Sequence, residues 1–359
     1  MRMTAAVLGG MLLAFASVGA ARESGVAGER HGTTTLASAA VRDAGHRDAL
    51  RYTVWYPAQA GSRENALTIG PPDAPLFDAG RSAKDAPVAG DRLPTLLLSH
   101  GNGGSARMMG WLGTALARAG YLVIAVDHPG NNGVDTMTLP GSLLTWLRAD
   151  DLCAALAAVQ ADPVLGPHVD PERLGVAGFS AGGYTALLAA GARPDLQRLR
   201  DFCTAHPDDG VCRPQQEAAT HTMEARVAAA ASPELSPWMS HANDARAIPG
   251  VRAVFLLAPA IVQAFAPEQL SSLKQPVSIV LGQADTVAPP QTNGEAARAV
   301  IAGAALQVLP GVGHYDFLAA CTPAGQQRLQ DLCSTSVPKA QTHAQAADAA
   351  IRFFNHSLR

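Results

Sequence analysis

The sequence has 359 residues, enough for one large domain or two domains of ordinary size. Apolar residues make up 48% of the chain and charged residues 16%, so it can bury a substantial core. The formal net charge is -3, which excludes the basic surface that is typical of nucleic-acid-binding proteins. Composition therefore indicates a globular protein with no nucleic-acid partner.

Residues 1–20 have the pattern of a secretory signal peptide. An early arginine precedes an apolar run over 5–18, and small residues follow it. The run is shorter than the roughly 20 residues that a membrane-spanning helix needs. We therefore expect cleavage near Ala20 or Ala21 and export to the periplasm or the extracellular space. No later segment is long and apolar enough to span a bilayer.

The next part of the chain predicts little regular structure. Residues 21–48 form a Gly/Ala/Ser-rich leader that we expect to be flexible. ALRYTVWYPA, over 49–58, is rich in aromatic and β-branched residues and predicts a strand. The polar, Gly/Pro-rich stretch over 61–92 predicts a long surface loop. The ordered domain is therefore expected to cover 49–359.

From residue 93 onward, short apolar runs alternate with helical patterns. LPTLLLSHG, YLVIAVDHPG and RLGVAGFS predict strands, and each is followed by a helical segment. The alternation pauses over 192–250 and resumes with VRAVFLLAPA, PVSIVLGQAD and ALQVLPGVGH before a C-terminal helix. Continuous apolar strands between helices predict an α/β fold with a mostly parallel central sheet, helices on both faces, and 192–250 as a cap-like insertion.

Five cysteines follow the predicted signal, and an odd number leaves one thiol unpaired in an oxidising compartment. Cys203 with Cys212 and Cys321 with Cys333 are the local pairs, the simplest of the three possible connectivities of these four. Cys153 lies on the apolar side of a helical pattern, where we expect a small buried side chain. No Cys/His spacing resembles a zinc site, so no metal ion is expected.

The pentapeptide GFSAG places Ser180 where a strand-like run becomes a helix-like one. Gly178 and Gly182 have no Cβ atom, so the backbone can turn sharply there and pack closely. A strand, a turn and a helix form the context of a nucleophile elbow, in which the serine hydroxyl is held out for attack. An ordinary tight turn is the alternative, and the context favours the nucleophile.

A serine hydroxyl needs a base within hydrogen-bond reach to be a good nucleophile. His314, in the glycine-flanked loop LPGVGHYDFL, is the best candidate among the eleven histidines. Asp285 ends the strand-like run PVSIVLGQAD, and we expect it at the same sheet edge as Ser180, orienting the imidazole. The chain order Ser, Asp, His is found in neither chymotrypsin-like nor subtilisin-like enzymes.

Asp127 also ends a strand-like run and is the rival acid. We expect it instead to order the loop over 128–133 through side-chain to backbone hydrogen bonds. Asp316 is too close to His314 in sequence to be preferred. The other histidines in loops, insertions or tails are expected to be solvated: His46, His128, His168, His206, His221, His241, His343 and His356.

The stretch SHGNGGS, over 99–105, follows a strand-like run and opens a helix-like one. Its glycines permit close approach, and its backbone N–H groups can point into a site. We expect the backbone amides of Asn102 and Ala181 to form an oxyanion hole, with His100 supporting the loop. A flexible Gly/Asn turn is the alternative.

Three apolar side chains are candidates for an acyl pocket. Trp238 and Met239 lie in the insertion, and Phe265 follows the run VRAVFLLAPA. Ligand sites are mostly apolar, which fits these residues, but packing of the insertion onto the domain accounts for them equally well. The proposed chemistry requires no metal ion and no organic cofactor.

Together these motifs resemble those of the alpha/beta-hydrolase superfamily, and they cover most of residues 49–354. The chain is most similar to exported dienelactone-hydrolase-like proteins and to serine hydrolases of the platelet-activating-factor acetylhydrolase type. Dienelactone hydrolases proper carry a nucleophilic cysteine, whereas this chain has Ser180. The resemblance is carried by VWYPA at 54–58, LLLSHGNGG at 96–104, VIAVDHPG at 123–130, GFSAGG at 178–183, LGQAD at 281–285 and GVGHYDFL at 311–318.

The resemblance implies a serine esterase that cleaves carboxylic esters, small or lipid-like, through an acyl-enzyme on Ser180. Lipase or acetylhydrolase, lactonase and amidase activities are alternatives that use the same triad. A catalytically silent binding protein on the same scaffold is the alternative of another class. No helix for docking to lipid is identified in the sequence.

Overall fold

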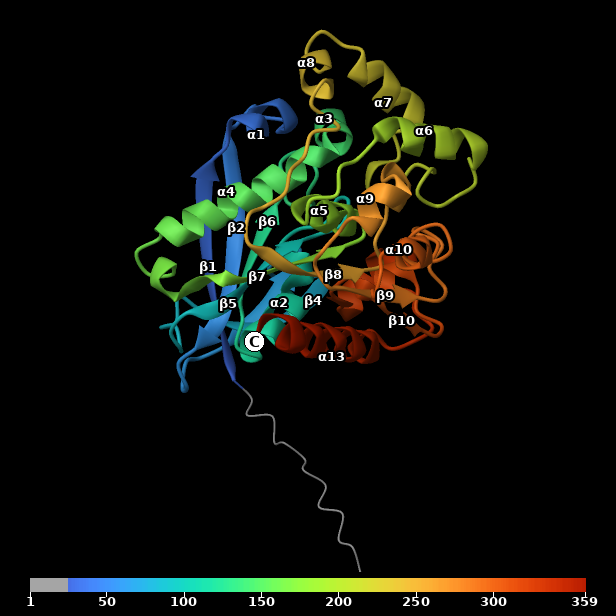
Figure 1. Cartoon of the computed structure of the whole chain (residues 1–359). Coiled ribbons are helices and arrows are strands. Elements are labelled where there is room, and N and C mark those ends of the chain that lie inside the picture. Colours follow the sequence, from blue (N-terminus) through green and yellow to red (C-terminus); the bar gives the residue numbers. More distant parts are fainter. Residues whose placement is uncertain (1–24) are drawn as a thin grey trace, which may run out of the picture.

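The computed structural model describes residues 25–359, and eleven strands of this part form one sheet (Figure 1). Six of these strands run parallel in the order β10-β9-β8-β7-β5-β6. They are β5 (Leu93–Ser99), β6 (Leu122–Asp127), β7 (Val169–Phe179), β8 (Val251–Leu257), β9 (Val277–Gly282) and β10 (Ala305–Leu309). Every residue of β5 and β9 is buried, as continuous apolar strands in a covered parallel sheet require.

Helices cover both faces of the parallel strands. Leu97 belongs to the core beneath α4 (Arg148–Ala161) and α5 (Ala181–Ala189), while its neighbours Leu96 and Leu98 belong to the core beneath α2 (Gly110–Arg118) and α13 (Lys339–Leu358). Successive side chains of a strand point to opposite faces, so one apolar strand supplies both cores. The predicted sheet with helices on both faces is confirmed.

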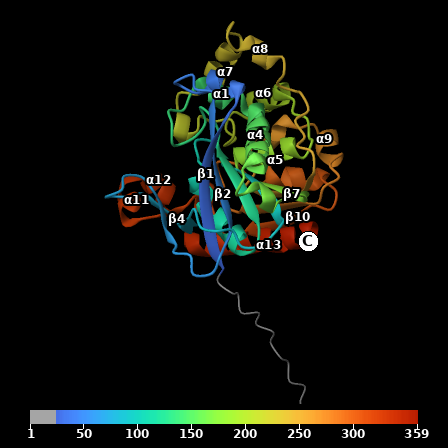
Figure 2. The ribbon, with the colours of Figure 1, turned by 90° about the vertical axis from the view of Figure 1, so that its left-hand side faces the viewer.

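Nine further α-helices complete the described part of the chain. They are α1 (Ala37–Arg42), α3 (Leu139–Leu143), α6 (Leu196–Ala205), α7 (Met223–Ala230), α8 (Ser236–Met239), α9 (Pro267–Ser271), α10 (Gly294–Val300), α11 (Pro323–Arg328) and α12 (Gln330–Cys333). Helices α6, α7 and α8 belong to the expected insertion and lie together at one end of the molecule in both views (Figures 1 and 2). No helix of residues 25–359 has the length and apolar character needed to cross a bilayer.

The expectation of a flexible leader is wrong for residues 26–48. Strand β1 (Val26–Thr35) pairs antiparallel with β2 (Ala49–Ala58) along its whole length, from Val26 opposite Ala58 to Thr35 opposite Ala49. Its Glu29 is 3% exposed and accepts hydrogen bonds from the Trp55 indole and the Ser82 hydroxyl. These partners lie far away in sequence, so composition alone does not reveal them. The predicted signal, 1–20, lies outside the described residues.

The stretch 61–92 is also more ordered than the predicted loop. It contains β3 (Asn65–Ile69) and β4 (Phe77–Lys84), which pair antiparallel, and β4 also pairs with β1. A short strand, β11 (Ala320–Cys321), is antiparallel to β4. Leu67, Phe77 and Ala79 form a small core with Ala319. Strand β4 has no β-branched residues, so its own sequence does not favour a strand. It is ordered because it pairs with neighbouring strands.

The structure contains both expected disulfides, Cys203–Cys212 and Cys321–Cys333. Cys153 was expected to be buried, but it is exposed. On helix α4 the buried face carries Leu152 and Leu156, and the neighbouring position 153 therefore turns outward.

Candidate active site

Ser180 occupies a sharp turn between β7 and α5, with a φ of 55° and a ψ of -122°. Non-glycine residues rarely adopt a positive φ, so the surrounding structure must impose it. A Cβ atom on Gly178 would lie 1.9 Å from the Gly182 carbonyl oxygen, and one on Gly182 would lie 2.1 Å from that of Ser99. Only glycine fits at these two positions, which explains why both flank the serine.

The structure brings Ser180, Asp285 and His314 together at the carboxyl ends of the parallel strands. The His314 Nε2 atom lies 2.9 Å from the Ser180 Oγ atom, and its Nδ1 atom lies 2.7 Å from the Asp285 Oδ2 atom. The three residues are between 5% and 7% exposed. Such a hydroxyl, imidazole and carboxylate can move a proton from the serine to the ring and stabilise the resulting charge.

Backbone amides fix the carboxylate in this arrangement. The Asp285 Oδ1 atom accepts hydrogen bonds from the backbone amides of Val287, at 2.9 Å, and Ala288, at 2.8 Å. The other carboxylate oxygen is therefore left to face the His314 ring. Because both oxygens are engaged, the carboxylate cannot rotate away from the imidazole without losing these bonds.

The loop that carries His314 is fastened on both sides. The Asp316 carboxylate accepts a hydrogen bond from the Gly313 amide at 2.7 Å, so Asp316 shapes the loop rather than serving the imidazole. Lys339 of α13 donates to the Tyr315 carbonyl at 2.6 Å, and burial lowers the pKa of this lysine to about 8. The Phe179 ring packs 4.9 Å, centroid to centroid, from the His314 ring.

Asn102 lies in the loop after β5, and Ala181 is the first residue of α5. Neither backbone amide finds a hydrogen-bond acceptor within residues 25–359, so both are available to a ligand. His100 supports the loop as expected, because its Nδ1–H group donates to the Gly101 carbonyl at 2.6 Å. The loop is therefore held by its own histidine while two amide donors stay free.

A chain of buried side chains holds Asn102. Its Oδ1 atom accepts a hydrogen bond from the Asn131 side chain at 2.8 Å, and the Asn131 Oδ1 atom accepts one from Arg148 at 2.7 Å. Arg148 also donates to the carbonyl oxygen of His100 and is 1% exposed. No local pattern predicts this relay, because its members come from three separate segments of the chain.

A second hydroxyl, imidazole and carboxylate meet inside the core. The Ser99 Oγ atom lies 2.9 Å from His128 Nε2, and His128 Nδ1 lies 2.8 Å from Asp151. Arg42 of α1 donates to both oxygens of that carboxylate, at 2.9 and 2.7 Å. Burial lowers the pKa of His128 to about 3, so the ring is neutral near pH 7. Ser99, His128 and Asp151 are all 0% exposed, which closes this set to substrates.

The buried His128 contradicts the expectation that it is solvated. His343 also differs from expectation, since it stacks on Trp111 with ring centroids 4.0 Å apart and donates to the Leu318 carbonyl. Aromatic and hydrogen-bonding partners from other elements account for both. His221, half-buried, accepts a hydrogen bond from Ser142. Of the other histidines expected to be solvated, His168 is half-buried, and four are exposed: His46, His206, His241 and His356.

Asp127 does not order the loop that follows it. It accepts a hydrogen bond from the Ala106 amide at 2.8 Å and pairs with Arg51. The loop is held instead by Asn132, whose side chain donates to the His128 carbonyl and accepts from backbone amides further on. The expectation for Asp127 is therefore wrong, and Asn132 orders this loop. Either an aspartate or an asparagine can close such a turn, so residue type alone does not distinguish the two.

The cavity that Ser180 and His314 line is small, with a volume of about 20 Å³. Two residues of the insertion, Gln215 and Glu217, form part of its wall, and Tyr315 forms another part. An open hollow of about 530 Å³ adjoins it, since Gln215, His314 and Tyr315 line both. The inner space holds about one water molecule, and the larger hollow leads to it from the His314 side.

The expected pocket residues do not line this cavity. Phe265 is 3% exposed, packs 5.2 Å from the Tyr184 ring and borders a different hollow. Met239 borders a third cavity, and Trp238 packs against the core. Packing of the insertion, the alternative given above, describes Trp238 and Phe265 better. The sequence pointed to large apolar side chains of the insertion, whereas the insertion residues that line the cavity, Gln215 and Glu217, are polar.

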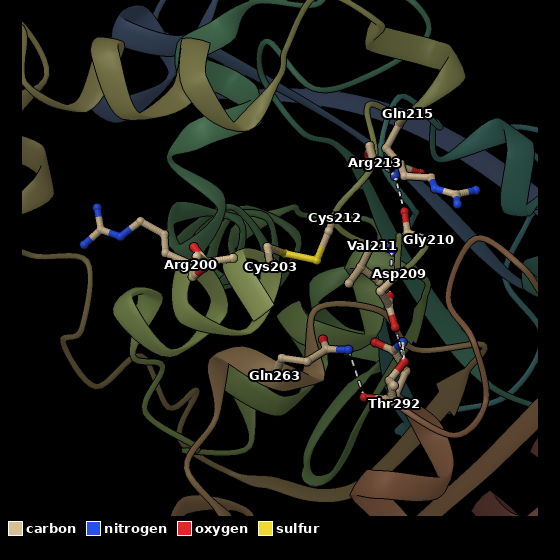
Figure 3. The surroundings of a disulfide bond; sticks show 12 residues. Arg200, Cys203, Asp209, Gly210, Val211, Cys212, Arg213, Gln215, Gln263 and Thr292 are labelled. Carbon is tan, nitrogen blue, oxygen red and sulfur yellow. Dashed lines mark hydrogen bonds between the residues drawn. A yellow bond between two sulfur atoms is a disulfide. The ribbon is translucent and has the colours of Figure 1, made fainter. Parts of the chain in front are cut away.

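Residues 210–218 of the insertion cover Ser180, and we call them the covering segment. At one end the Cys203–Cys212 disulfide joins it to α6, and the Asp209 carboxylate accepts a hydrogen bond from the Thr292 hydroxyl (Figure 3). A Cβ atom on Gly210 would lie 2.1 Å from the Thr286 carbonyl oxygen, so the segment touches the loop that follows Asp285. The chain therefore crosses the site under covalent and steric restraint.

At its other end the covering segment rests on residues 100–105, which we call the oxyanion loop after the role expected for Asn102. Gly103 has a φ of 61°, and a Cβ atom there would lie 2.7 Å from the Cβ atom of Glu217. Among residues 25–359, no group of three or more His, Cys, Asp or Glu side chains is placed to bind a metal ion.

Comparison with known proteins identifies relatives. The family model described as "Serine aminopeptidase, S33" matches residues 91–317. Cutinase 1 of Thermobifida cellulosilytica is 34% identical over 102 residues, which are 28% of this chain and 35% of the relative. Lipase 1 of Moraxella sp. (strain TA144) is 35% identical over 96 residues, 27% of each chain. The chain thus spans about a third of the length of the curated relatives it matches.

A solved structure covers more of the chain. The ferulic acid esterase from Streptomyces cinnamoneus superposes with a TM-score of 0.59 at 22% sequence identity, covering 93% of this chain and 90% of that one. At this level of identity the likeness concerns the fold, which is the alpha/beta-hydrolase fold. The expectation drawn from the sequence motifs is confirmed at the level of this superfamily.

Proposed function

Since the chain belongs to the serine aminopeptidase S33 family of serine hydrolases, we propose that it hydrolyses carboxylic esters through an acyl-enzyme formed on Ser180. The observation that carries the proposal is the continuous contact from the Ser180 hydroxyl through His314 to Asp285. A carboxylic ester hydrolase needs this contact at an accessible sheet edge, next to free amide donors.

The proposed reaction has two halves. His314 takes the proton of Ser180 as its Oγ atom bonds to the ester carbonyl carbon, and the Asn102 and Ala181 amides hold the oxyanion. The ester C–O bond then breaks, and His314 gives the proton to the departing alcohol. Water next attacks the acyl-enzyme by the same route, which releases the carboxylic acid and restores Ser180. Asp285 keeps the ring in the required tautomer throughout.

The same triad can hydrolyse esters, lactones and amides, and we propose esters as the substrates. Cutinase and lipase are the names of the curated relatives, and both favour an ester. The family description names an aminopeptidase, which keeps amides as a second class. Lipid esters and lactones would use the same triad. A panel of esters graded by acyl length, with a lactone and an amide, separates these activities.

The test of the nucleophile is covalent labelling. An organophosphonate probe is expected to label the wild-type chain and to leave Ser180→Ala unlabelled, and that variant should lose turnover by up to roughly a millionfold. Ser99→Ala is the matched control, because Ser99 belongs to the buried set and should keep the label. A Ser180→Ala protein that retained esterase activity would contradict the proposal.

We also propose that the protein is exported. Two disulfides occur within the described residues, and disulfides persist in oxidising compartments. The N-terminal residue of the mature protein, measured by mass spectrometry of protein made in its host, tests the expected removal of 1–20.

A further inference from the structure

The covering segment places a carboxylate at the catalytic cavity. Glu217 lines the same cavity as Ser180 and His314. The Glu217 Cβ atom packs against Gly103 of the oxyanion loop. A side chain at position 103 would collide with it, so only glycine leaves enough room. The position of Glu217 is therefore set by backbone contact, and its side chain lies where a substrate must bind.

The groups around this carboxylate do not neutralise it. The side chains that act on it are the Tyr315 hydroxyl, the Asn102 amide and the His314 ring, and none is a lysine or an arginine. The Glu217 side chain is exposed, but the cavity wall removes part of the hydration of its carboxylate and so raises its pKa, without supplying a lysine or an arginine. A carboxylate that has no ion pair attracts a cation brought beside it, and the solvent that reaches Glu217 weakens this attraction without abolishing it.

The Asn102 side chain points to the same space. Its Oδ1 atom is occupied by Asn131, and its Nδ2 atom is buried with no acceptor among residues 25–359. This donor and the Glu217 carboxylate thus lie close together in the cavity wall, where the Asn102 amide acts on the carboxylate. A ligand that enters the cavity meets both groups.

The shape of the site indicates which part of the substrate lies next to Glu217. The inner cavity of about 20 Å³ accepts a small group, whereas the open hollow of about 530 Å³ adjoins it at His314. His314 gives its proton to the departing alcohol, so the alcohol must lie on this side. Tyr315, which lines both spaces, links Glu217 to the path of the alcohol.

We propose that Glu217 is a specificity-determining residue that selects esters whose alcohol portion carries a positive charge close to the scissile bond. The proposal rests on the proposed ester hydrolysis by Ser180. A cation there replaces the hydration that the carboxylate has lost, and an anion is repelled. A neutral alcohol of the same shape gains neither effect.

Acetylcholine and its uncharged isostere 3,3-dimethylbutyl acetate test the proposal at pH 8, with 4-acetoxybutanoate as the anionic substrate. In wild type, kcat/KM is expected to fall from the cationic to the neutral to the anionic ester. Glu217→Gln keeps the shape of the side chain and removes its charge. The ratio of cationic to neutral kcat/KM should then fall about tenfold, which corresponds to about 1.4 kcal/mol.

Glu234→Gln is the matched control, since Glu234 is an exposed glutamate of the same insertion outside the cavity. It should leave the ratio unchanged. A ratio that is the same in Glu217→Gln and wild type would overturn the proposal. So would a Glu217→Gln protein in which all three esters react faster by the same factor, because Glu217 would then act as a steric cover and not as a charge.

A pair of phosphonothiolates distinguishes two outcomes: that the role proposed for Glu217 is wrong, or that the proposed ester hydrolysis itself is wrong. Their leaving groups are thiocholine and its dimethylbutyl isostere. Ser180 forms the O–P bond, the P–S bond breaks, and the thiolate takes the proton that His314 received. No labelling of wild type by either compound would sink the hydrolase proposal itself. Labelling of wild type and Glu217→Gln with equal preference for the cation would sink the role of Glu217 alone.

Discussion

At the scale of single residues, the oxyanion loop depends on a side chain that never reaches the cavity. Asn131 donates to Asn102 and accepts from the buried Arg148. We predict that Asn131→Ala lowers kcat about tenfold with a small change in KM. Complete loss of an oxyanion donor costs about 100- to 1000-fold, and a displaced donor keeps part of that effect.

Steady-state kinetics on one ester measures this effect. Asn355→Ala is the control, because Asn355 accepts a hydrogen bond from Tyr121 far from the triad and should leave kcat unchanged. If Asn131→Ala has the kcat of wild type, and circular dichroism shows an intact fold, the contact between Asn131 and Asn102 does not contribute to catalysis.

The residues differ in how far the sequence could predict them. Ser180, Asp285 and His314 each follow a strand pattern, and parallel strands end at one sheet edge, so their meeting was predictable. Ser99, His128 and Asp151 have the same chemistry, but their contact depends on burial and on Arg42 from the N-terminal segment. Glu217 could not be predicted, because no local pattern states where an irregular insertion crosses the fold.

At the scale of elements, the N-terminal segment is part of the core. Arg42 of α1 is 1% exposed and forms a two-bond ion pair with Asp151 of α4. We predict that Arg42→Ala lowers the free energy of unfolding by about 3–5 kcal/mol, because it leaves a buried carboxylate without its cation. Denaturant unfolding followed by circular dichroism measures the change.

The control for this prediction is Arg252→Ala. Arg252 pairs with Glu172 where both side chains are exposed, and solvent screens such pairs, so its removal should change stability little. If both variants unfolded at the same denaturant concentration, the buried ion pair would not be what holds α1 on α4.

Elements were predicted best where their own residues are apolar. Strands β5 to β9 were identified because each contains a largely apolar run, and β10 because ALQVL continues the alternation of strands with helices. The sequence predicts a flexible leader and a loop where β1 and β4 lie, because VAGERHGTTT and FDAGRSAK contain glycine and charged residues. Their order comes from pairing with neighbouring strands, and pairing is a property of the whole sheet.

At the scale of the whole molecule, neutral buried histidines make the fold sensitive to acid. Burial lowers the pKa of His128 to about 3 and that of His100 well below its ordinary range. The unfolded chain binds protons near pH 6.5, and the folded chain does not. Stability is therefore greatest above pH 6.5 and falls as the pH drops toward 3.

At pH 5 the expected loss is about 2 kcal/mol for His128, from about 1.5 pH units at about 1.4 kcal/mol each. Thermal unfolding between pH 7 and pH 4.5 measures it. Glu29 and Asp151 have lowered pKa values and add to the loss only at lower pH. A His128→Asn variant should show a shallower dependence on pH, and a slope equal to that of wild type would refute this assignment.

The connection that carries His314 is anchored in strands at both ends. Before it, β10 pairs with β9, and after it β11 pairs with β4, near the other end of the sheet. Between them the Trp111 indole donates to the Phe317 carbonyl at 3.0 Å. The connection therefore loses its conformational entropy when the chain folds. It does not have to be ordered again each time a substrate binds. On warming, the proposed turnover should persist until the sheet unfolds, and activity and folded structure should then be lost together.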